Sequence, residues 1–341
     1  MKSMKKVFAL VLALIMSLSL VACGNDTAKS DSSGTPDSSK PDTSAEETYP
    51  TKDVQMYIGY GAGGGSDLLA RALAKYIDLG DQTMVCTNLT GGSGTIAMME
   101  CWNAEPDGYS MNLCLPESFA VQVLNDSMEE DVFDKLIFLA SPVYDVNSLN
   151  VLSTSDIQTT EDLIAYATEH PGELTIAGVG SGVNKLWAVE IMQKLGIELQ
   201  YIPYEDSNAT RAALLGGQVD LLLCQSCESK TYYDSGEFTI LGVCANEKVS
   251  FFPDVDTFTE QGYDIVSGIH RGFAMTPDTP AEIVADMESR VKAVYDNPEF
   301  QDYMHDTLGF NTVWTGHDEY EALAAQCLKD FPALMEAAAN Y

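Results

Sequence analysis

The chain has 341 residues and is strongly acidic, with 51 Asp and Glu residues against 18 Lys and Arg and a formal net charge of −33 at pH 7. A surface this negative repels phosphate groups, which argues against nucleic acids and anionic lipid surfaces as partners. It also repels anionic solutes at long range, so an anion site would need backbone N–H groups or a few well-placed cations.

The first 22 residues have the layout of a secretory signal. Lys2, Lys5 and Lys6 precede an apolar run from residue 7 to about residue 21, which is too short to be a stable spanning helix. The run ends in Leu20-Val21-Ala22-Cys23, which resembles a bacterial lipobox. We therefore expect an extracytoplasmic protein whose Cys23 is lipidated and anchored at the outer face of the cytoplasmic membrane. A cytosolic protein with an apolar N-terminal helix is the alternative, but no acidic residue precedes Cys23.

Residues 23–49 are expected to form a disordered tether. They are mostly Ser, Asp, Thr, Pro and Gly, and such a segment buries too little apolar surface to offset the entropy of ordering. About 290 residues then remain, which is more than one compact core usually holds, so we expect two lobes.

From residue 54 onward, strand-like and helix-like segments alternate, a pattern typical of an α/β fold with a mostly parallel sheet. In the first half we expect strands at 54–60, 83–87, 110–115 and 136–140, and helices at 66–77 and 95–103. The alternation then restarts, with strands at 149–152, 174–177, 199–202, 219–224, 239–243 and 264–274, and helices at 160–169, 184–195 and 207–215. Helices at 280–295, 298–308 and 317–339 form a tail. Two copies of one layout predict two doubly wound lobes, in which ligands bind at the carboxyl ends of the strands.

Besides Cys23 the chain has seven cysteines: Cys86, Cys101, Cys114, Cys224, Cys227, Cys244 and Cys327. Cys224 and Cys227 have the spacing of a redox pair or of half a zinc site, but no second pair completes a metal set. Most of the seven lie in apolar segments, where cysteine behaves as a small buried hydrophobe. We expect structural thiols and no metal.

Three loops have one form: a strand, then glycines with a small hydroxyl residue, then the start of a helix. The first reads Gly59-Tyr60-Gly61-Ala62-Gly63-Gly64-Gly65-Ser66-Asp67. Glycines let the backbone approach a ligand closely, and the helix that follows offers free N–H groups to an anion. The glycine spacing also matches a dinucleotide fingerprint. We reject that interpretation, because an exported chain meets little NAD and Asp67 would repel a pyrophosphate. No cofactor is expected.

The second and third loops are Thr90 to Thr95, which contains Ser93, and Gly178 to Gly182. Neither has the spacing of a nucleophile elbow or of a nucleotide-binding Walker loop. Any one of the three loops could be a simple turn before a helix. Three of them, on both halves of the chain, favour a shared anion site.

His270 and Arg271 are the remaining candidates for chemistry. Arg271 is one of only four arginines, and its planar fork suits a carboxylate held by two hydrogen bonds. An internal salt bridge is an equally good interpretation of this arginine in so acidic a chain. A secreted hydrolase using Ser93 or Ser181 with His270 is the catalytic alternative, but no acid that would orient the base can be assigned. We expect a protein that is not an enzyme.

Six motifs, in order, resemble the Bug-type receptors of tripartite tricarboxylate transporters. They are Tyr49-Pro50 with the Gly63 to Asp67 loop, the Asn88 to Thr95 loop, the turn Pro106-Asp107-Gly108-Tyr109, the Gly178 to Gly182 loop, Ile202-Pro203-Tyr204, and the stretch Leu214 to Asp220. The resemblance runs from about residue 49 to the C-terminus. It implies a two-lobed, type II-like periplasmic-binding-protein fold, in which each lobe is a mixed, mostly parallel sheet flanked by helices. Residues 50–145 and 268–341 would form domain 1, and residues 146–267 would form domain 2.

The resemblance further implies a monomer that captures a small organic acid, a di- or tricarboxylate or a relative, by closing its lobes like a flytrap. The acid would be delivered to a membrane permease of two subunits; a lipoprotein that signals to a membrane kinase is the alternative. The expected ligand-binding residues are Tyr60, Gly63, Gly64, Gly65, Ser66, Asp67, Ser93, Gly180, Ser181, Gly182, Lys185, Tyr204, Gln225, Ser226, His270 and Arg271. Many members of the family have Trp-Phe-Gly or Trp-Arg-Gly where this chain has His270-Arg271-Gly272, so the identity of the acid is open.

Overall fold

The computed structural model describes residues 49–339, which belong to one compact unit. The expected signal sequence, Cys23 and nearly all of the expected tether fall on residues 1–48, outside the described residues. None of the described helices is long and apolar enough to cross a membrane.

The first half of the fold contains the expected alternation of strands and helices. Its elements are β1 (Val54–Ile58), α2 (Gly65–Tyr76), β2 (Met84–Asn88), the 3-10 turn η1 (Gly92–Gly94), α3 (Thr95–Trp102), β3 (Ser110–Cys114), α4 (Pro116–Leu124) and α5 (Glu130–Lys135). The sequence analysis missed α4 and α5. Helix α4 buries polar Glu117 and Gln122 along with its apolar residues, so it has no amphipathic period that would reveal it.

Strand β4 (Ile137–Leu152) corrects the largest error of the sequence analysis, which expected two separate strands at 136–140 and 149–152. The segment between them contains Pro142 and several polar residues, a composition typical of a loop. In the structure this 16-residue strand is buried almost throughout. Its polar side chains find partners there: the amide of Asn147 donates to Ser267 Oγ at 2.8 Å, and Ser148 Oγ and Ser229 Oγ are 2.7 Å apart.

The second half repeats the alternation. Its elements are α6 (Thr160–Glu169), β5 (Thr175–Val179), α7 (Val183–Leu195), β6 (Gln200–Tyr204), α8 (Ser207–Leu215), β7 (Leu221–Gln225), α9 (Ser226–Asp234) and β8 (Phe238–Val243). Capping explains the agreement for α6 and α8, because Thr159 and Asp206 each accept a hydrogen bond from a first-turn N–H group. Helix α9 was not expected.

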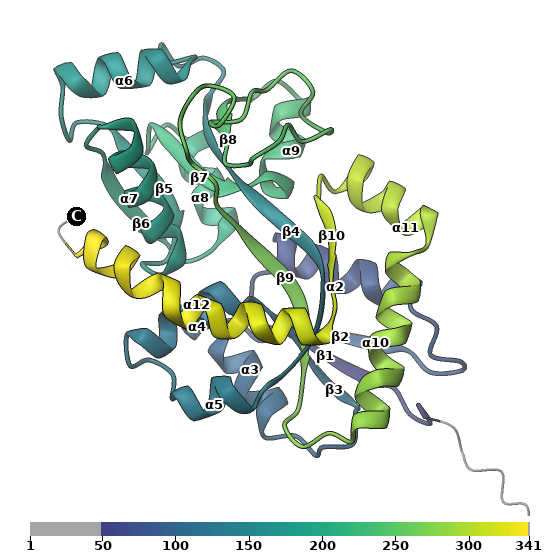
Figure 1. Cartoon of the computed structure of the whole chain (residues 1–341). Helices are drawn as coiled ribbons and strands as arrows, with labels where there is room; N and C mark the ends of the chain where they lie inside the picture. The colour runs from purple at the N-terminus through teal and green to yellow at the C-terminus, as the bar shows by residue number, and fades with distance from the viewer. Residues whose placement is uncertain (1–48, 340–341) are drawn as a thin grey trace, which may run out of the picture. The chain divides into compact units, whose positions relative to one another are not determined.

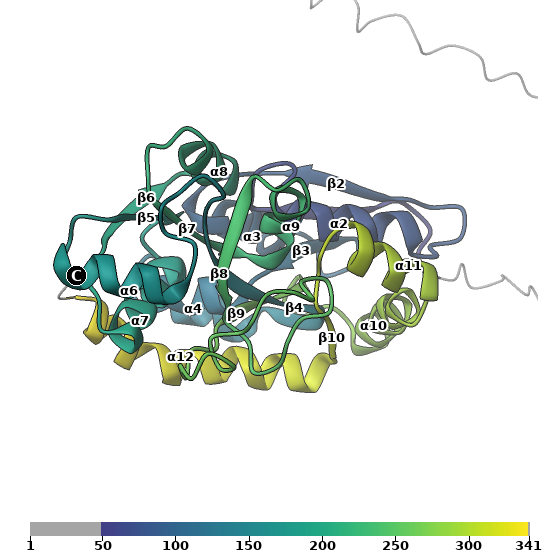
Figure 2. The ribbon, with the colours of Figure 1, turned by 90° about the horizontal axis from the view of Figure 1, so that it is seen from above.

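The chain then returns through β9 (Gly268–Met275) into its tail. The tail contains α10 (Ala281–Tyr295), α11 (Pro298–Asp302), the π-helical turn η2 (Tyr303–Thr307), β10 (Thr312–Thr315) and α12 (His317–Ala338). The helix expected at 298–308 is therefore α11 followed by η2, the strand expected at 264–274 begins only at Gly268, and β10 was missed. Helix α12 packs against α4 and β4 and also against α7 of the second half, as Figure 2 shows.

The strands follow the order β2-β1-β3-β9-β4-β7-β5-β6, and β8 and β10 both pair with β4. Strands β2, β1 and β3 are parallel, and so are β7, β5 and β6, whereas every antiparallel pair involves β4 or β9. Figure 1 shows these two long strands running side by side between the two parallel groups. The expected mixed α/β fold class is confirmed. The division into domains 50–145 with 268–341, and 146–267, stays a prediction.

Candidate functional site

A cavity of about 380 Å³ lies where the loops of the two parallel groups meet. Its wall is formed mainly by the segments that follow β1, β2, β5, β6 and β7, and β9 adds Ile269 and Arg271. The carboxyl ends of parallel strands are the usual ligand position in doubly wound folds. The cavity therefore lies where the alternation of strands and helices predicts a ligand.

The structure brings part of the expected site together in this wall. The expected residues that line the cavity are Tyr60, Gly64, Gly65, Ser66, Ser93, Gly180, Gly182, Gln225 and Arg271. The expected residues that do not line it are Gly63, Asp67, Ser181, Lys185, Tyr204, Ser226 and His270.

At Gly59 and Gly65 the first glycine loop packs so closely that a side chain would clash with its neighbours. A Cβ atom on Gly59 would lie 2.4 Å from the Cα of Gly94, so β1 and the second loop touch backbone to backbone. A distant side chain, Glu228 Oε1, lies 3.5 Å from the Gly65 N–H, and the N-cap of α2 is Gly64, which has no side chain that could cap the helix. Its first-turn N–H groups therefore face the cavity without a side-chain acceptor at the cap position.

The second loop is held by its neighbours through one carbonyl group. The carbonyl oxygen of Ser93 accepts a hydrogen bond from Tyr60 Oη at 3.0 Å and from Gln122 Nε2 at 3.2 Å. Ser93 itself has a left-handed backbone, with φ 51°. Tyr60 thus contributes to the site by fixing the loop as well as by lining the cavity.

The third loop contributes its backbone and not its serine. The carbonyl oxygen of Gly180 accepts a hydrogen bond from Tyr201 Oη at 2.7 Å, and Gly182 is the N-cap of α7, which no side chain caps within residues 49–339. Ser181 is exposed and lies outside the cavity wall. Lys185, on the first turn of α7, is half-buried and also lies outside the wall.

Arg271 forms an internal salt bridge and also lines the cavity. Its Nε donates to Asp145 Oδ2 at 2.9 Å, in a pair whose side chains are 4% and 0% exposed. Its other nitrogens donate to Ser66 Oγ at 2.8 Å and to Gln225 Oε1 at 3.3 Å. Burial lowers the pKa of the guanidinium, but the Asp145 carboxylate outweighs this and raises the pKa overall. The arginine is therefore an internal salt-bridge partner whose three guanidinium nitrogens are all bound by the protein in the wall of the cavity.

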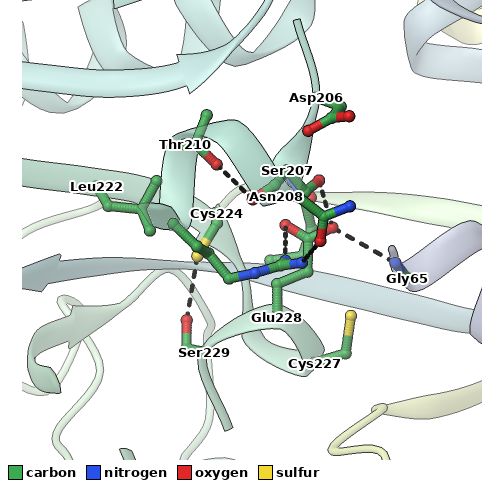
Figure 3. A network of polar contacts seen from close by, with 12 residues as sticks. Gly65, Asp206, Ser207, Asn208, Thr210, Leu222, Cys224, Cys227, Glu228 and Ser229 are labelled. Carbon is green, nitrogen blue, oxygen red and sulfur yellow. Dashed lines mark hydrogen bonds and ion pairs between the residues drawn. The ribbon is translucent and has the colours of Figure 1, made fainter. Parts of the chain in front are cut away.

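Glu228, on the first turn of α9, is a cavity residue that sequence reasoning missed. Its side chain is 4% exposed, and its Oε1 accepts hydrogen bonds from Ser207 Oγ at 2.8 Å and from the Gly65 N–H at 3.5 Å. Figure 3 shows Glu228 between Gly65 and Ser207. It thus joins the start of α2 to the start of α8. A glutamate on an undetected helix gives no local signal of burial.

Other wall residues were missed although a signal exists for some of them. They include Thr90, Ser118, Asn184, Glu205, Asp206, Ser207 and Asn208. Asp206 caps α8, accepting from the Ala209 N–H at 2.8 Å, and its segment follows β6 as the glycine loops follow β1 and β5. A strand that ends at a capping residue marks the same edge of the sheet as a glycine loop does.

We expected Asp67 to face the ligand, but its carboxylate is bound by three donors of the protein itself. It accepts hydrogen bonds from the Gly63 N–H, from Arg71 Nε and from Asn88 Nδ2, each at 2.9 Å. Burial raises the pKa of its carboxyl, and the three donors outweigh this, so the pKa is lowered. Asp67 holds the loop that contains Gly63 against α2 and β2.

Two further expected residues are turned to the interior. Ser226 Oγ donates to Asp145 Oδ1 at 2.9 Å, so this serine supports the partner of Arg271. Tyr204 packs in an apolar cluster that includes Leu214 and Leu222. Both residues stabilise the elements that carry the wall.

His270 is held away from the cavity by Glu117. Its Nδ1 and its main-chain N lie 2.6 and 3.0 Å from Glu117 Oε1, and its ring packs on Tyr144 with centroids 4.6 Å apart. A hydrolase would need this imidazole beside Ser93 or Ser181. The geometry does not supply that arrangement.

Residues 49–339 contain neither a cluster of metal-binding side chains nor a disulfide bond. In that range no group of three or more His, Cys, Asp or Glu residues could hold a metal ion. The seven cysteines described are free thiols, and all except Cys86 are buried. Their burial fits the role of structural thiols, which stays a prediction.

Comparisons with known proteins agree with this architecture. A family model described as tripartite tricarboxylate transporter family receptor, TctC, matches residues 69–339. The UPF0065 protein in the gbd 5' region of Cupriavidus necator is 26% identical over 297 residues, covering 85% of this chain and 88% of the relative. The solved structure of the periplasmic binding protein BugD is 25% identical, covering 85% of this chain and 99% of its own, with a TM-score of 0.75.

A second solved structure, R. palustris Rpa4515 with adipate, shares the fold with a TM-score of 0.79 at 22% identity, covering 85% of this chain and 98% of its own. The matched family is a family of receptors and BugD is a periplasmic binding protein, so the prediction that the chain is not an enzyme is confirmed.

Proposed function

This chain belongs to the receptor family of the tripartite tricarboxylate transporters, and we propose that it captures a small carboxylate in the cavity and delivers it to a membrane permease of two subunits. The acid is bound without chemical change. No cofactor and no nucleic acid takes part.

The observation that carries this proposal is the convergence of helix N-termini on one cavity. Helices α2 and α7 begin at its wall with glycine N-caps, which have no side chain that could cap the helix. The first N–H group of α2, that of Gly65, lies 3.5 Å from Glu228 Oε1. Each such terminus stabilises an anion by about 0.3–1 kcal/mol, and by up to about 2 kcal/mol where the site is partly buried. Arg271 adds a fixed cation to the same wall. Together these groups suit a carboxylate, even within a chain of strong negative charge.

The size of the cavity supports a small solute. Its volume of about 380 Å³ lies at the lower end of the range of about 300–1,000 Å³ that small-molecule sites occupy. The related fold of Rpa4515 was solved with adipate, a short dicarboxylate. We infer that the acid is of similar size and that it is held between the domains 50–145 with 268–341 and 146–267, which close on it in a monomer.

The remaining parts of the proposal concern location. The signal ends in a lipobox-like sequence. We infer that residues 1–22 are cleaved off, that Cys23 is lipidated, and that the protein is held at the outer face of the cytoplasmic membrane. Residues 23–49 would give the receptor reach toward its permease. Replacement of Cys23 by Ala should abolish incorporation of labelled fatty acid into the protein. Unchanged labelling of the variant would exclude lipidation at this residue.

A thermal-shift screen tests the binding function. The purified protein is titrated with mono-, di- and tricarboxylates, and each acid is matched by its neutral amide as a control. A ligand at a hundredfold its dissociation constant adds about 2.7 kcal/mol to the free energy of unfolding. We expect one class of acid to raise the melting temperature and its amide to leave it unchanged. Equal shifts with the amides, or no shift with any acid, would contradict the proposal.

A further inference from the structure

The start of α2 already has a carboxylate of the protein beside it. Glu228 Oε1 lies 3.5 Å from the Gly65 N–H and accepts a hydrogen bond from Ser207 Oγ at 2.8 Å, contacts that Figure 3 shows. The same oxygen lies 3.9 Å from Arg271 Nη2, and Glu228 Oε2 lies 3.7 Å from Arg211 Nη1. Glu228 therefore fills, from within the protein, a position where a helix start and a guanidinium group would otherwise bind an anion.

A bound acid would not displace Glu228 from this position. The side chain of Glu228 is 4% exposed and that of Arg211 is 8% exposed. Moving the carboxylate away would leave the charge of Arg211 buried without its partner, and breaking a buried ion pair is strongly unfavourable. The carboxylate of Glu228 is thus a permanent part of the wall.

The charged groups beside the cavity offer no spare cation to a second carboxylate. A buried cluster of two carboxylates and two guanidinium groups has no net charge and is joined by ion pairs of 2.9, 3.7 and 3.9 Å: Asp145, Glu228, Arg211 and Arg271. Among the described residues, the other charged members of the wall are Glu205 and Asp206, both acidic. A second carboxylate on the ligand would meet repulsion from Glu228, which is stronger in the protein interior than in water.

The helices that begin at the cavity show where one carboxylate can bind. Asp206 caps α8, Glu228 lies in the first turn of α9, and Asp67 lies in the first turn of α2. Helix α7 differs, because its N-cap is Gly182 and its first turn contains no acidic residue. Gly182 lines the cavity. The first N–H groups of α7 are therefore the ones left for an anion.

We propose that this protein selects acids with a single carboxylate, and that Glu228 excludes dicarboxylates by filling the place of the second one. This inference rests on the proposed carboxylate-binding function and narrows its substrate class to monocarboxylates. The carboxylate of the ligand binds the start of α7, and its uncharged remainder faces hydroxyl and amide groups of the wall such as Ser118 and Asn208. A ligand of this class resembles the adipate of the Rpa4515 structure in size and lacks its second charge.

Calorimetric titration of the full chain in detergent with matched ligands tests the inference. Each set contains a dicarboxylate, its monoamide and the monocarboxylate of the same chain length: succinate, succinamate and butyrate; glutarate, glutaramate and valerate; adipate, adipamate and hexanoate. L-aspartate with L-asparagine, and L-glutamate with L-glutamine, extend the comparison to amino acids. Any acid detected by the thermal-shift screen is added, with its monoamide where it has a second carboxylate.

In every set that binds, we expect the dicarboxylate to bind at least about tenfold more weakly than the tightest member with one carboxylate, because of charge repulsion at short range. A smaller difference, or tighter binding of the dicarboxylate, would overturn the inference and leave the proposed function intact. A protein that binds none of these acids would overturn the proposed function together with this inference.

The variant Glu228→Gln identifies the residue responsible. It removes the charge and keeps the shape of the side chain, so the difference in affinity between a dicarboxylate and its monoamide should shrink by at least about tenfold. Asp234→Asn, at the far end of the same helix, is the control and should keep the wild-type ratio. An unchanged ratio in Glu228→Gln would overturn the role of Glu228. If Glu228→Gln does not fold, the wild-type sets decide the selectivity for one carboxylate.

Discussion

Gly65 presents its backbone directly to the guanidinium of Arg271. A Cβ atom on Gly65 would lie 2.7 Å from Arg271 Cζ and 2.8 Å from Cys227 Sγ. The start of α2 therefore packs against β9 and α9 with no room for a side chain at this position. Gly65 is 163 residues from Glu228 of α9, and its neighbour Ser66 is 205 residues from Arg271 of β9. The contact joins the first glycine loop to the charged centre of the cavity.

Gly65→Ala should therefore lower the free energy of unfolding. The added methyl group has no room, and overpacking of this kind costs about 1–3 kcal/mol. Denaturant unfolding measures the loss. Gly61→Ala, in the same loop, is the control, because its Cβ would lie 3.4 Å from the nearest atom, Asp206 Oδ2. Equal stability of Gly65→Ala and wild type would mean that Arg271 is not packed against this position.

Removal of Asp145 should destabilise the fold more than loss of any surface ion pair. Asp145→Ala leaves the Arg271 charge buried without its partner, which costs about 3–5 kcal/mol. Asp107→Ala is the control, because the Lys52–Asp107 pair has side chains 60% and 42% exposed and exposed pairs contribute about 1 kcal/mol or less.

The double variant Asp145→Leu, Arg271→Met tests whether the unpaired buried charge of Arg271 is what destabilises Asp145→Ala. It removes both charges, and it should unfold at higher denaturant concentration than Asp145→Ala. A double variant less stable than Asp145→Ala would show that the hydrogen bonds of Arg271 to Ser66 and Gln225 outweigh its charge.

His270→Asn should leave the affinity for the bound acid unchanged. The imidazole is bound to Glu117 and does not line the cavity, so the substitution removes a structural contact and costs about 1 kcal/mol of stability. Titration with the acid identified in the screen measures the affinity. A loss of affinity comparable to that of Arg271→Lys, which replaces the fork of the wall arginine, would place His270 in the binding site.

Asp67 should make the stability of the protein sensitive to acid. Its pKa in the folded protein is lowered from the ordinary value of 3.8, so the unfolded chain takes up the proton at higher pH than the folded chain does. The stabilisation is therefore complete above the unfolded value and is lost as the pH falls through the lowered folded value.

Asp67→Asn should consequently be less stable than wild type near neutral pH, and the difference should shrink as the pH falls below 3.8. Thermal unfolding across this range measures both variants. Asp107→Asn, which alters an exposed pair, provides the control. A difference between Asp67→Asn and wild type that does not change with pH would exclude the carboxylate of Asp67 as its source.

The sequence alone was sufficient to predict most of the helices and strands and the place of the glycine loops. Periodicity locates α2, α10 and α12, and the caps Thr159 and Asp206 mark the starts of α6 and α8, because these signals depend on residues a few positions apart. The glycine loops around Gly65, Ser93 and Gly182 are local signals too, so their position at one edge of the sheet was predictable. The resemblance on six motifs predicted the fold and the family for the same reason.

The tertiary structure alone decided which side chains face the cavity and which are used to hold its wall. Asp67 and His270 are residue types that often bind ligands. In the structure, however, Asp67 is hydrogen-bonded to Arg71, and His270 lies within hydrogen-bond distance of Glu117. Strand β4 has the composition of a loop in its middle, yet neighbours on both edges satisfy its polar groups. Glu228 is an ordinary helical glutamate in the sequence. It becomes a cavity residue because distant elements surround it, and burial by distant elements leaves no signal in the residues next to it in the chain.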